Sequence, residues 1–120
     1  MAFARLSRVQ PTQDEALSLL KGMLAAQARG EGRDLTLRQL ALLAAVYQSE
    51  QPPTVRALAT ELGLSKPVIT RAIDALEGLE LCRRLPDPND RRSVVVQKTV
   101  RGSVFVDRLV GSFRGLNAPA

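Results

Sequence analysis

The chain of 120 residues carries a formal net charge of +5, and 45% of its residues are hydrophobic and 24% charged. Such a length and composition suit one globular core and exclude the disordered and collagen-like classes of protein. The cations are mostly arginine, whose planar donor fork suits phosphates and guanine edges, but a positive charge alone does not identify a nucleic-acid partner.

Two helices are predicted in the first half of the chain. After a loose arm over residues 1–11, helices are expected over residues 12–29 and 36–49. Each begins with a threonine that is followed three residues later by Glu or Gln, which is the spacing of a capping box. The second helix is apolar beyond a single stripe, which is typical of a helix buried in the middle of a small domain.

A tight turn separates the next two predicted helices, which run over residues 54–62 and 65–79. Gly63 can adopt the left-handed conformation that ends the first of them. Ser65 is placed to cap the second, and Pro67 is tolerated in its first turn. Two helices around a short glycine-containing turn are the signature of a helix-turn-helix.

The hydrophobic period then changes from helical to extended. Strands are predicted over residues 81–85 and 93–98 around a turn rich in Pro, Asp and Asn, which makes a β-hairpin, or wing. A last helix is expected over residues 99–114. The sequence therefore predicts a mainly α fold with a small β-hairpin, a winged helix-turn-helix. Residues 54–98 form its helix-turn-helix and wing within a single domain over residues 1–120.

Polar side chains gather on the outer face and at the N-terminal end of the helix over residues 65–79. Recognition helices enter the major groove of DNA with their N-terminal residues, where free backbone N–H groups also attract phosphate. A solvated face that happens to carry two cations is the plainer interpretation of this helix by itself, and the neighbouring turn and wing argue against it. The residues expected to face DNA are Ser65, Lys66, Pro67, Thr70 and Arg71.

The tip of the predicted wing carries a second set of candidate residues. Asp90 and Arg92 are two residues apart, so on an extended strand they point the same way and the carboxylate can hold the guanidinium in one orientation. Arg91 faces elsewhere and can meet a phosphate. An oriented arginine on a narrow loop suits the minor groove, where negative potential concentrates. The alternative is a local ion pair worth about 0–1 kcal/mol and without a function. Arg56 and Arg84 are further candidates for flanking phosphate contacts.

Six short motifs between residues 35 and 102 share the pattern of a known family. They are Leu35-Thr36-x-x-Gln39, Leu58-Ala59-x-x-Leu62-Gly63-Leu64-Ser65, Val68-x-Thr70-Arg71, Asp74-x-Leu76-Glu77, Asp87-x-x-Asp90-Arg91-Arg92-Ser93 and Thr99-x-x-Gly102. With them the chain resembles, over about residues 35–110, the MarR (multiple antibiotic resistance regulator) family of winged helix-turn-helix transcription regulators of bacteria. The resemblance implies that Thr70 and Arg71 face the major groove. It also implies that Arg92, braced by Asp90, enters the minor groove.

Three features depart from the pattern of that family. Glu80 stands where the family usually has glycine, so it must adopt an unfavourable backbone angle unless the preceding helix ends differently. Lys98 stands where an apolar residue is usual, and the segment after Gly102 is shorter than the C-terminal helices that build the family's dimer. A homodimer is still expected, because two half-sites one DNA turn apart need two copies of the DNA-binding domain. The helices over residues 12–29 and 99–116 are its predicted dimerisation elements.

The remaining predictions concern chemistry and location. The chain has no histidine and no recognisable catalytic or phosphate-binding motif, so we expect neither an enzyme nor a metal or cofactor site. Cys82, the single cysteine, is either a redox-sensitive thiol or a small core residue, and its place on a strand favours the core. The sequence shows neither a long apolar run nor a signal-peptide pattern, so we expect no membrane association and a cytoplasmic protein.

Double-stranded DNA is thus the expected partner and transcription regulation the expected function. The competing interpretation is a winged-helix module that binds another protein, since a fold does not determine a function. The exposed cations of the recognition helix argue against it. A small-molecule effector, which many relatives bind, has no support in a chain with one Tyr, three Phe and no Trp, because these form no obvious aromatic pocket.

Overall fold

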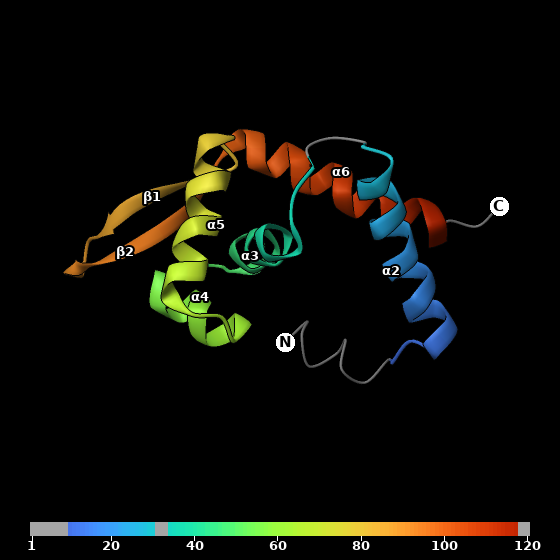
Figure 1. The fold of residues 1–120 in the computed structure, drawn as a ribbon, viewed down its shortest axis with the longest axis horizontal. Helices are drawn as coiled ribbons and strands as arrows, with labels where there is room; N and C mark the ends of the chain where they lie inside the picture. The colour runs from blue at the N-terminus through green and yellow to red at the C-terminus, as the bar shows by residue number, and fades with distance from the viewer. Residues whose placement is uncertain (1–9, 31–33, 118–120) are drawn as a thin grey trace. The chain divides into compact units, whose positions relative to one another are not determined.

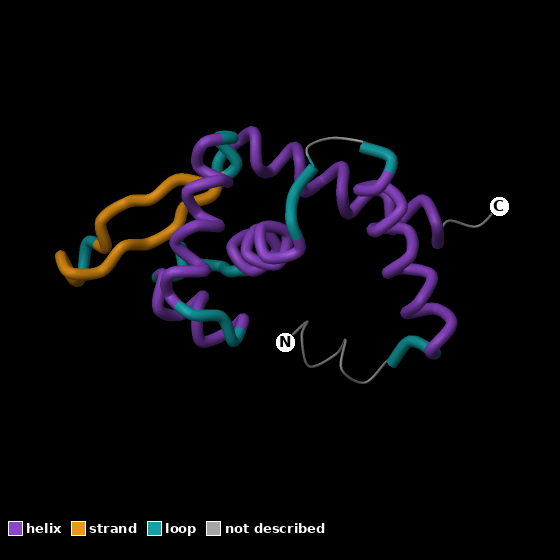
Figure 2. The backbone as a smooth tube through the Cα atoms, viewed as in Figure 1, coloured by secondary structure: helices purple, strands orange, loops and turns teal. Residues whose placement is uncertain are grey.

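The computed structural model describes residues 10–30 and 34–117, with the side chains of residues 112–117 left aside (Figures 1 and 2). The predicted arm over residues 1–11 therefore lies almost wholly outside the described residues. The chain divides into two compact units. One is made of the N-terminal helix and the end of the C-terminal helix, and the other runs from Asp34 to Arg108.

The smaller unit is built on helix α2, Gln13–Ala28, where the sequence predicted a helix. The Thr12 hydroxyl accepts a hydrogen bond from the Glu15 backbone N–H at 3.1 Å and so satisfies one of the free donors of the first turn. Ala26 is buried, whereas larger apolar side chains of the same helix stay exposed. These are Leu17, Leu20 and Leu24, with exposed fractions of 57%, 48% and 43%.

Three helices form the core of the larger unit: α3 (Leu37–Gln48), α4 (Val55–Leu62) and α5 (Lys66–Gly78). Helix α3 packs against both α4 and α5, and Figure 1 shows it end-on beside α5. It buries five of its side chains, as expected for a helix that is apolar beyond one stripe. The fully buried apolar side chains of this unit include Leu42, Val46, Leu58, Ile69, Ile73, Leu76 and Val96.

Local hydrogen bonds explain why these helices begin and end where the sequence indicated. Thr36 and Gln39 form a complete capping box, with side chain to backbone bonds of 3.0 and 3.2 Å. The Thr54 hydroxyl caps α4 by accepting from the Ala57 N–H at 3.0 Å. Gly63 has a φ of 65° at the end of α4, so the turn into α5 uses the left-handed conformation that glycine adopts without strain.

The wing is an antiparallel hairpin of β1 (Cys82–Asp87) and β2 (Asp90–Lys98), and it projects beside α5 (Figure 2). Its base is joined to the segment that precedes α4, because the Val96 N–H donates to the Pro53 carbonyl oxygen at 2.9 Å. This backbone hydrogen bond was not predicted from the sequence. It fixes the root of the wing to the start of the helix-turn-helix.

Both strands of the wing are longer than the predicted residues 81–85 and 93–98. Only Pro88 and Asn89 form the turn, and the pairing register shifts just before Asp87. The Asn89 N–H donates to the Asp87 carboxylate at 2.9 Å, so the side chain of Asp87 closes the turn. Such a turn needs fewer residues than the loop that the Pro, Asp and Asn cluster predicted. The arginines at the wing tip therefore lie on β2 itself.

Helix α6, Val100–Asn117, ends three residues beyond the predicted residue 114, and its first turn is held to the core by Tyr47 of α3. The Tyr47 hydroxyl donates to the Leu81 carbonyl oxygen at 2.7 Å and accepts from the Thr99 N–H at 3.0 Å. Gly102 lies so close to this hydroxyl that a β-carbon would not fit. Neither α6 nor any other described helix is long and apolar enough to cross a lipid bilayer.

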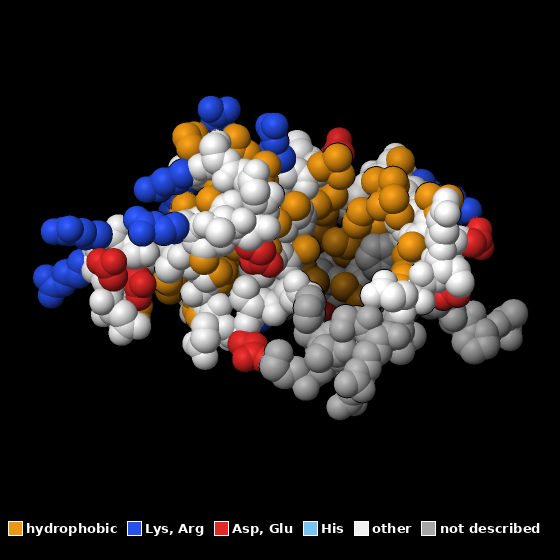
Figure 3. Space-filling view, turned by 90° about the horizontal axis from the view of Figure 1, so that it is seen from below, with side chains coloured by type: hydrophobic (Ala, Val, Ile, Leu, Met, Phe, Trp, Pro, Cys, Tyr) orange, Lys and Arg blue, Asp and Glu red, His pale blue; other side chains and the backbone are white. Residues whose placement is uncertain are grey.

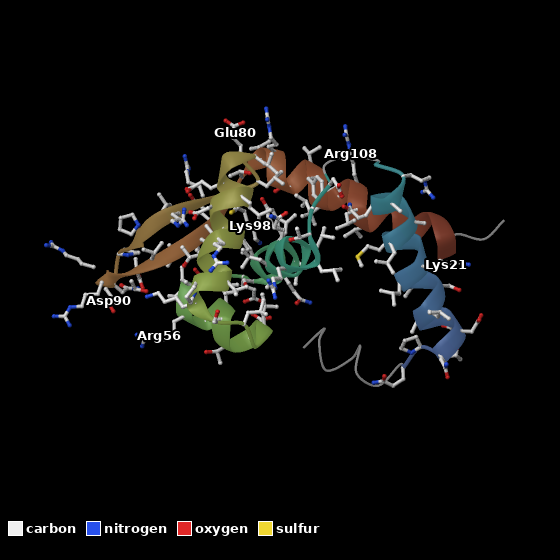
Figure 4. The ribbon with its side chains drawn as sticks, in the orientation of Figure 1. Lys21, Arg56, Glu80, Asp90, Lys98 and Arg108 are labelled. Atoms are coloured by element: carbon white, nitrogen blue, oxygen red, sulfur yellow. The ribbon has the colours of Figure 1, made fainter. Side chains whose placement is uncertain are left out.

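Glu80 joins α5 to the wing at the end of α5 remote from α4 (Figure 4). Its φ of 63° confirms the unfavourable backbone angle expected for a residue that replaces a glycine. The Thr99 hydroxyl donates to the Glu80 carbonyl oxygen at 2.7 Å, and the Glu80 carboxylate pairs with Arg101 at 3.1 Å. The surrounding hydrogen bonds thus hold a strained residue at the junction.

Glu80→Gly is expected to raise the free energy of unfolding by about 1 kcal/mol, because glycine adopts this angle without a clashing β-carbon. The ion pair that is lost joins two exposed side chains and contributes little. Thermal unfolding should show a rise in Tm of about 4–8 °C. Glu80→Gln, which removes the charge and keeps the strained angle, is the control. A Tm for Glu80→Gly at or below that of the original chain would mean that the angle is not costly.

Cys82 begins β1 with an exposed fraction of 1%, as the interpretation as a core residue predicted. Burial, aided by the Glu77 carboxylate and opposed by Arg84, raises the pKa of its thiol from 9.0 to about 11. Because the folded-state pKa is the higher one, this group stabilises the fold below about pH 9, and the contribution is lost as the pH rises through about 11.

The native Cys82 thiol is expected to react with a disulfide reagent at pH 8 about 100-fold more slowly than the same thiol in the urea-unfolded chain. The thiolate is the reacting form, and its fraction at that pH falls tenfold for each unit by which the pKa rises. Absorbance of the released reagent measures both rates. Equal rates in the native and unfolded chains would place Cys82 among the redox-sensitive thiols instead.

Candidate nucleic-acid interface

The N-terminal end of α5 presents the predicted recognition residues. The Ser65 hydroxyl caps the helix by accepting a backbone N–H one turn further on at 3.4 Å, and Pro67 lies in the first turn. Lys66 and Arg71 are exposed, and Thr70 is half-buried. Neither cation takes part in an ion pair within the described part of the chain, so both charges are available to an external anion.

The wing tip presents two further exposed cations, Arg91 and Arg92, which also have no ion-pair partner among the described residues. Figure 3 shows Lys and Arg side chains gathered at the wing end of the larger unit, and Figure 4 places Asp90 at the tip. Asp87 and Asp90 lie at the same end of the hairpin, so the tip presents two exposed cations next to two carboxylates.

The prediction that the Asp90 carboxylate holds the Arg92 guanidinium is wrong, because the carboxylate binds the backbone of Arg92 instead. The Asp90 carboxylate accepts from the Arg92 backbone N–H at 3.0 Å, and no ion pair joins the two side chains in the described structure. An aspartate on a tightly turned chain reaches the main-chain N–H two residues on more readily than a long side chain that water solvates. Asp90 therefore fixes the backbone at Arg92 and leaves the guanidinium free.

An open groove of about 890 Å³ lies between helix α4, helix α5 and the wing. Its lining brings together cations from three elements that are separate in the sequence, with the carboxylates of Asp87 and Asp90 at the wing. Figure 4 shows Arg56 on α4 on the side of the wing tip. The lining cations are Arg56, Lys66, Arg84 and Arg92.

Arg84 differs from the other three cations because its guanidinium is already paired. It lies on β1 and contacts Asp74 and Glu77 of α5, with Nη1 2.7 Å from Glu77 Oε1, and its side chain is only 28% exposed. Burial on its own would lower the pKa of Arg84, but the hydrogen bonds and charges of the two carboxylates outweigh it and raise the pKa above its usual value. The expectation that Arg84 contacts phosphate is therefore at odds with the structure.

A second hollow, of about 160 Å³, lies between the N-terminal turn of α3 and the middle of α5. Arg38 and Arg71 both line it, and Arg38 is exposed and has no ion-pair partner in the described residues. Arg38 was not among the residues predicted from the sequence. The available signal was a cation in the first turn of a helix, where the helix dipole disfavours it unless an anion is near.

Comparison with known proteins gives one family for this chain. The model of the MarR family matches residues 35–94, half of the chain, from the start of α3 into the wing. An uncharacterized HTH-type transcriptional regulator of Bacillus subtilis (strain 168), YhbI, is 31% identical over 85 residues, which are 71% of this chain and 54% of that protein. The chain thus spans about half the length of the curated relative that it matches.

Solved structures of regulators share the fold. Transcriptional regulator Tm0710 from Thermotoga maritima superposes with a TM-score of 0.73 at 23% identity, covering 97% of this chain and 75% of the other. MepR from S. aureus, solved as a complex with DNA, gives a TM-score of 0.67 at 21% identity, covering 98% of this chain and 86% of the other. At this level of identity the likeness establishes the winged helix-turn-helix fold.

Proposed function

The chain belongs to the MarR family of transcription regulators, and we propose that it binds double-stranded DNA and regulates transcription. One observation carries this proposal. Exposed cations without anionic partners in the described structure stand at the start of α5 and at the tip of the wing, on either side of one groove. A helix fits the major groove of B-DNA, and a narrow basic hairpin fits the minor groove next to it. The single cysteine, buried and free, fits a cytoplasmic location.

The residues divide between the two grooves in the proposed complex. Thr70 and Arg71 reach base edges in the major groove, and Lys66 meets a phosphate near the positive end of α5. Arg92 enters the minor groove from the wing tip. Arg91, which points to the other side of β2, meets the phosphate backbone.

Flanking contacts extend this surface. Ser65 and Pro67 bring the backbone of the first α5 turn close to the phosphates, because neither carries a bulky side chain. Arg56 lines the same groove from α4. Arg38 shares its hollow with Arg71, and we include it as an added phosphate contact from α3.

We further propose that the DNA-binding species is a homodimer that uses the helices over residues 12–29 and 99–116. A dimer places two recognition helices about 34–36 Å apart, one turn of DNA. Exposed apolar side chains on α2 and α6 support this, because apolar surface gathered on a few elements is typical of a protein–protein contact. They are Leu17, Leu20 and Leu24 of α2, and Val104 and Val110 of α6. Sedimentation equilibrium measures the mass, and a monomer at micromolar concentration would contradict the proposal.

The salt dependence of binding tests the proposed function directly. Each neutralised phosphate releases counterions, so a dimer that makes 6–10 phosphate contacts should lose about 10³–10⁵ in affinity between 50 and 200 mM salt. Fluorescence anisotropy with a duplex selected from a random library gives the slope, and the selection also shows any two-fold symmetry. Affinity that stays flat over this range would contradict binding through phosphate contacts, and a chain that selects no duplex from the library would exclude DNA as the partner.

A further inference from the structure

Among the described residues, the side-chain hydrogen bonds that join the wing to α5 all involve one residue of the wing, Arg84 of β1. Its backbone N–H donates to Glu77 Oε2 at 2.9 Å, and its guanidinium donates to Glu77 Oε1 at 2.7 Å, to the Asp74 carboxylate and to the Thr70 carbonyl oxygen at 3.2 Å. These acceptors extend along about two turns of α5, so they fix the direction of the helix against the strand as well as its distance. No other wing side chain in the described structure hydrogen-bonds to α5.

The same contacts make Arg84 unsuited to a direct DNA contact. A guanidinium has five N–H donors in one rigid plane, and α5 already takes up both of its terminal nitrogens. Asp74, which is 61% exposed, would otherwise present an unpaired negative charge to DNA from the recognition helix. Arg84 offsets one of the two negative charges that Asp74 and Glu77 place on α5 and thus reduces repulsion toward phosphate.

We propose that Arg84 is a positioning residue, which with Asp74 and Glu77 sets the separation and angle between the recognition helix and the wing. It determines whether α5 and Arg92 can occupy neighbouring grooves at the same time, and it does so without touching DNA. This deepens the proposed function and rests on it. A helix and a wing that are held in place before binding lose less conformational freedom when they bind.

Three variants separate positioning from simple charge. Arg84→Met removes the guanidinium and keeps an unbranched apolar side chain of similar length. Arg84→Lys keeps the charge, but a lysine ammonium cannot replace a planar fork that bridges Asp74, Glu77 and the Thr70 carbonyl. The double variant Asp74→Asn, Glu77→Gln removes the partners from the side of α5. Arg83→Met is the matched control, because Arg83 is exposed and its side chain bonds only to Gln97 within the hairpin.

Each variant is assayed by affinity for a duplex selected with the original chain and by hydroxyl-radical footprinting. Arg84→Met and Arg84→Lys should both weaken binding by about tenfold or more, with protection by the wing lost and protection by α5 kept. The double variant should also bind more weakly, although it removes two negative charges. Arg83→Met should change the affinity by less than about threefold and leave the footprint unchanged.

Two results would overturn the proposal. If Arg84→Lys binds the duplex as tightly as the original chain does, or if the double variant binds it more tightly, Arg84 acts by charge alone. Hydrogen exchange of the free protein gives a readout that needs no DNA: the amides of β1 and β2 should exchange faster in Arg84→Met while those of α3 keep their protection. If exchange in the wing is unchanged, the connection to α5 is not what holds the wing.

These measurements also separate this proposal from the proposed function. A chain that binds no duplex at low salt refutes DNA binding, whereas faster exchange in the wing of Arg84→Met would still support Arg84 as the residue that holds the wing against α5. If Arg84→Met fails to unfold cooperatively, the double variant, which leaves β1 unaltered, provides the same comparison.

Discussion

Arg92→Ala is expected to weaken DNA binding by about 10- to 100-fold while the free energy of unfolding changes by less than about 0.5 kcal/mol. The Arg92 side chain is exposed and has no ion-pair partner in the described structure, so its removal breaks no ion pair there. Its backbone N–H keeps the hydrogen bond to Asp90 at 3.0 Å, and the tip of the wing therefore keeps its shape. Fluorescence anisotropy and thermal unfolding measure the two quantities.

Arg83→Ala is the matched control for this prediction. It removes the same charge from the same hairpin, but from a residue near the base of the wing that is paired with Gln97. The loss in Arg92→Ala should persist at salt concentrations that abolish the small effect of Arg83→Ala, because a cation inside the minor groove is screened less than one on the surface. Equal losses in the two variants would mean that Arg92 contributes only net charge.

Gly102→Ala is expected to lower the free energy of unfolding by about 3 kcal/mol or more. A β-carbon at this position would lie far inside contact distance of the Tyr47 hydroxyl and the Leu81 carbonyl oxygen. The chain can relieve the clash only by breaking the hydrogen bonds of Tyr47 to Leu81 and Thr99, which measure 2.7 and 3.0 Å. Thermal unfolding should show a fall in Tm of about 10–20 °C.

Gly78→Ala tests whether this loss comes from the close approach at Gly102. Both glycines are helical, and a β-carbon on Gly78 would meet nothing within 4 Å. Alanine at Gly78 should therefore leave the stability unchanged or raise it by up to about 1 kcal/mol, since alanine favours the helix. A loss at Gly102 no larger than about 1 kcal/mol would show that the Tyr47 junction yields to a methyl group at little cost.

Short-range sequence signals were sufficient to predict most of the helix-turn-helix. The caps at Thr36, Thr54 and Ser65 and the left-handed turn at Gly63 depend on atoms within a few residues of one another, and each is present in the structure. The strained angle at Glu80 is a local property of the same kind. Short-range hydrogen bonds and backbone sterics explain why these features could be predicted from the chain alone.

The errors at the candidate site concern side-chain partners. Strand alternation placed Asp90 and Arg92 on one side of the wing, but it could not show that the carboxylate would prefer a backbone N–H. Arg84 resembles the other cations in the sequence. Its partners Asp74 and Glu77 precede it by ten and seven residues, and they approach it only because the wing folds back against α5.

The sequence by itself thus determined the order of the elements, the ends of the helices in the helix-turn-helix and the basic character of the chain. Hydrophobic period, caps and turn residues act over a few positions, and the net positive charge depends on composition alone. Only the tertiary structure decided which cations are free and which are already paired. An arginine contacts either an outside phosphate or an inside carboxylate, and that choice depends on which elements the core brings together, as α3, α5 and the wing show for Arg38, Arg71 and Arg84.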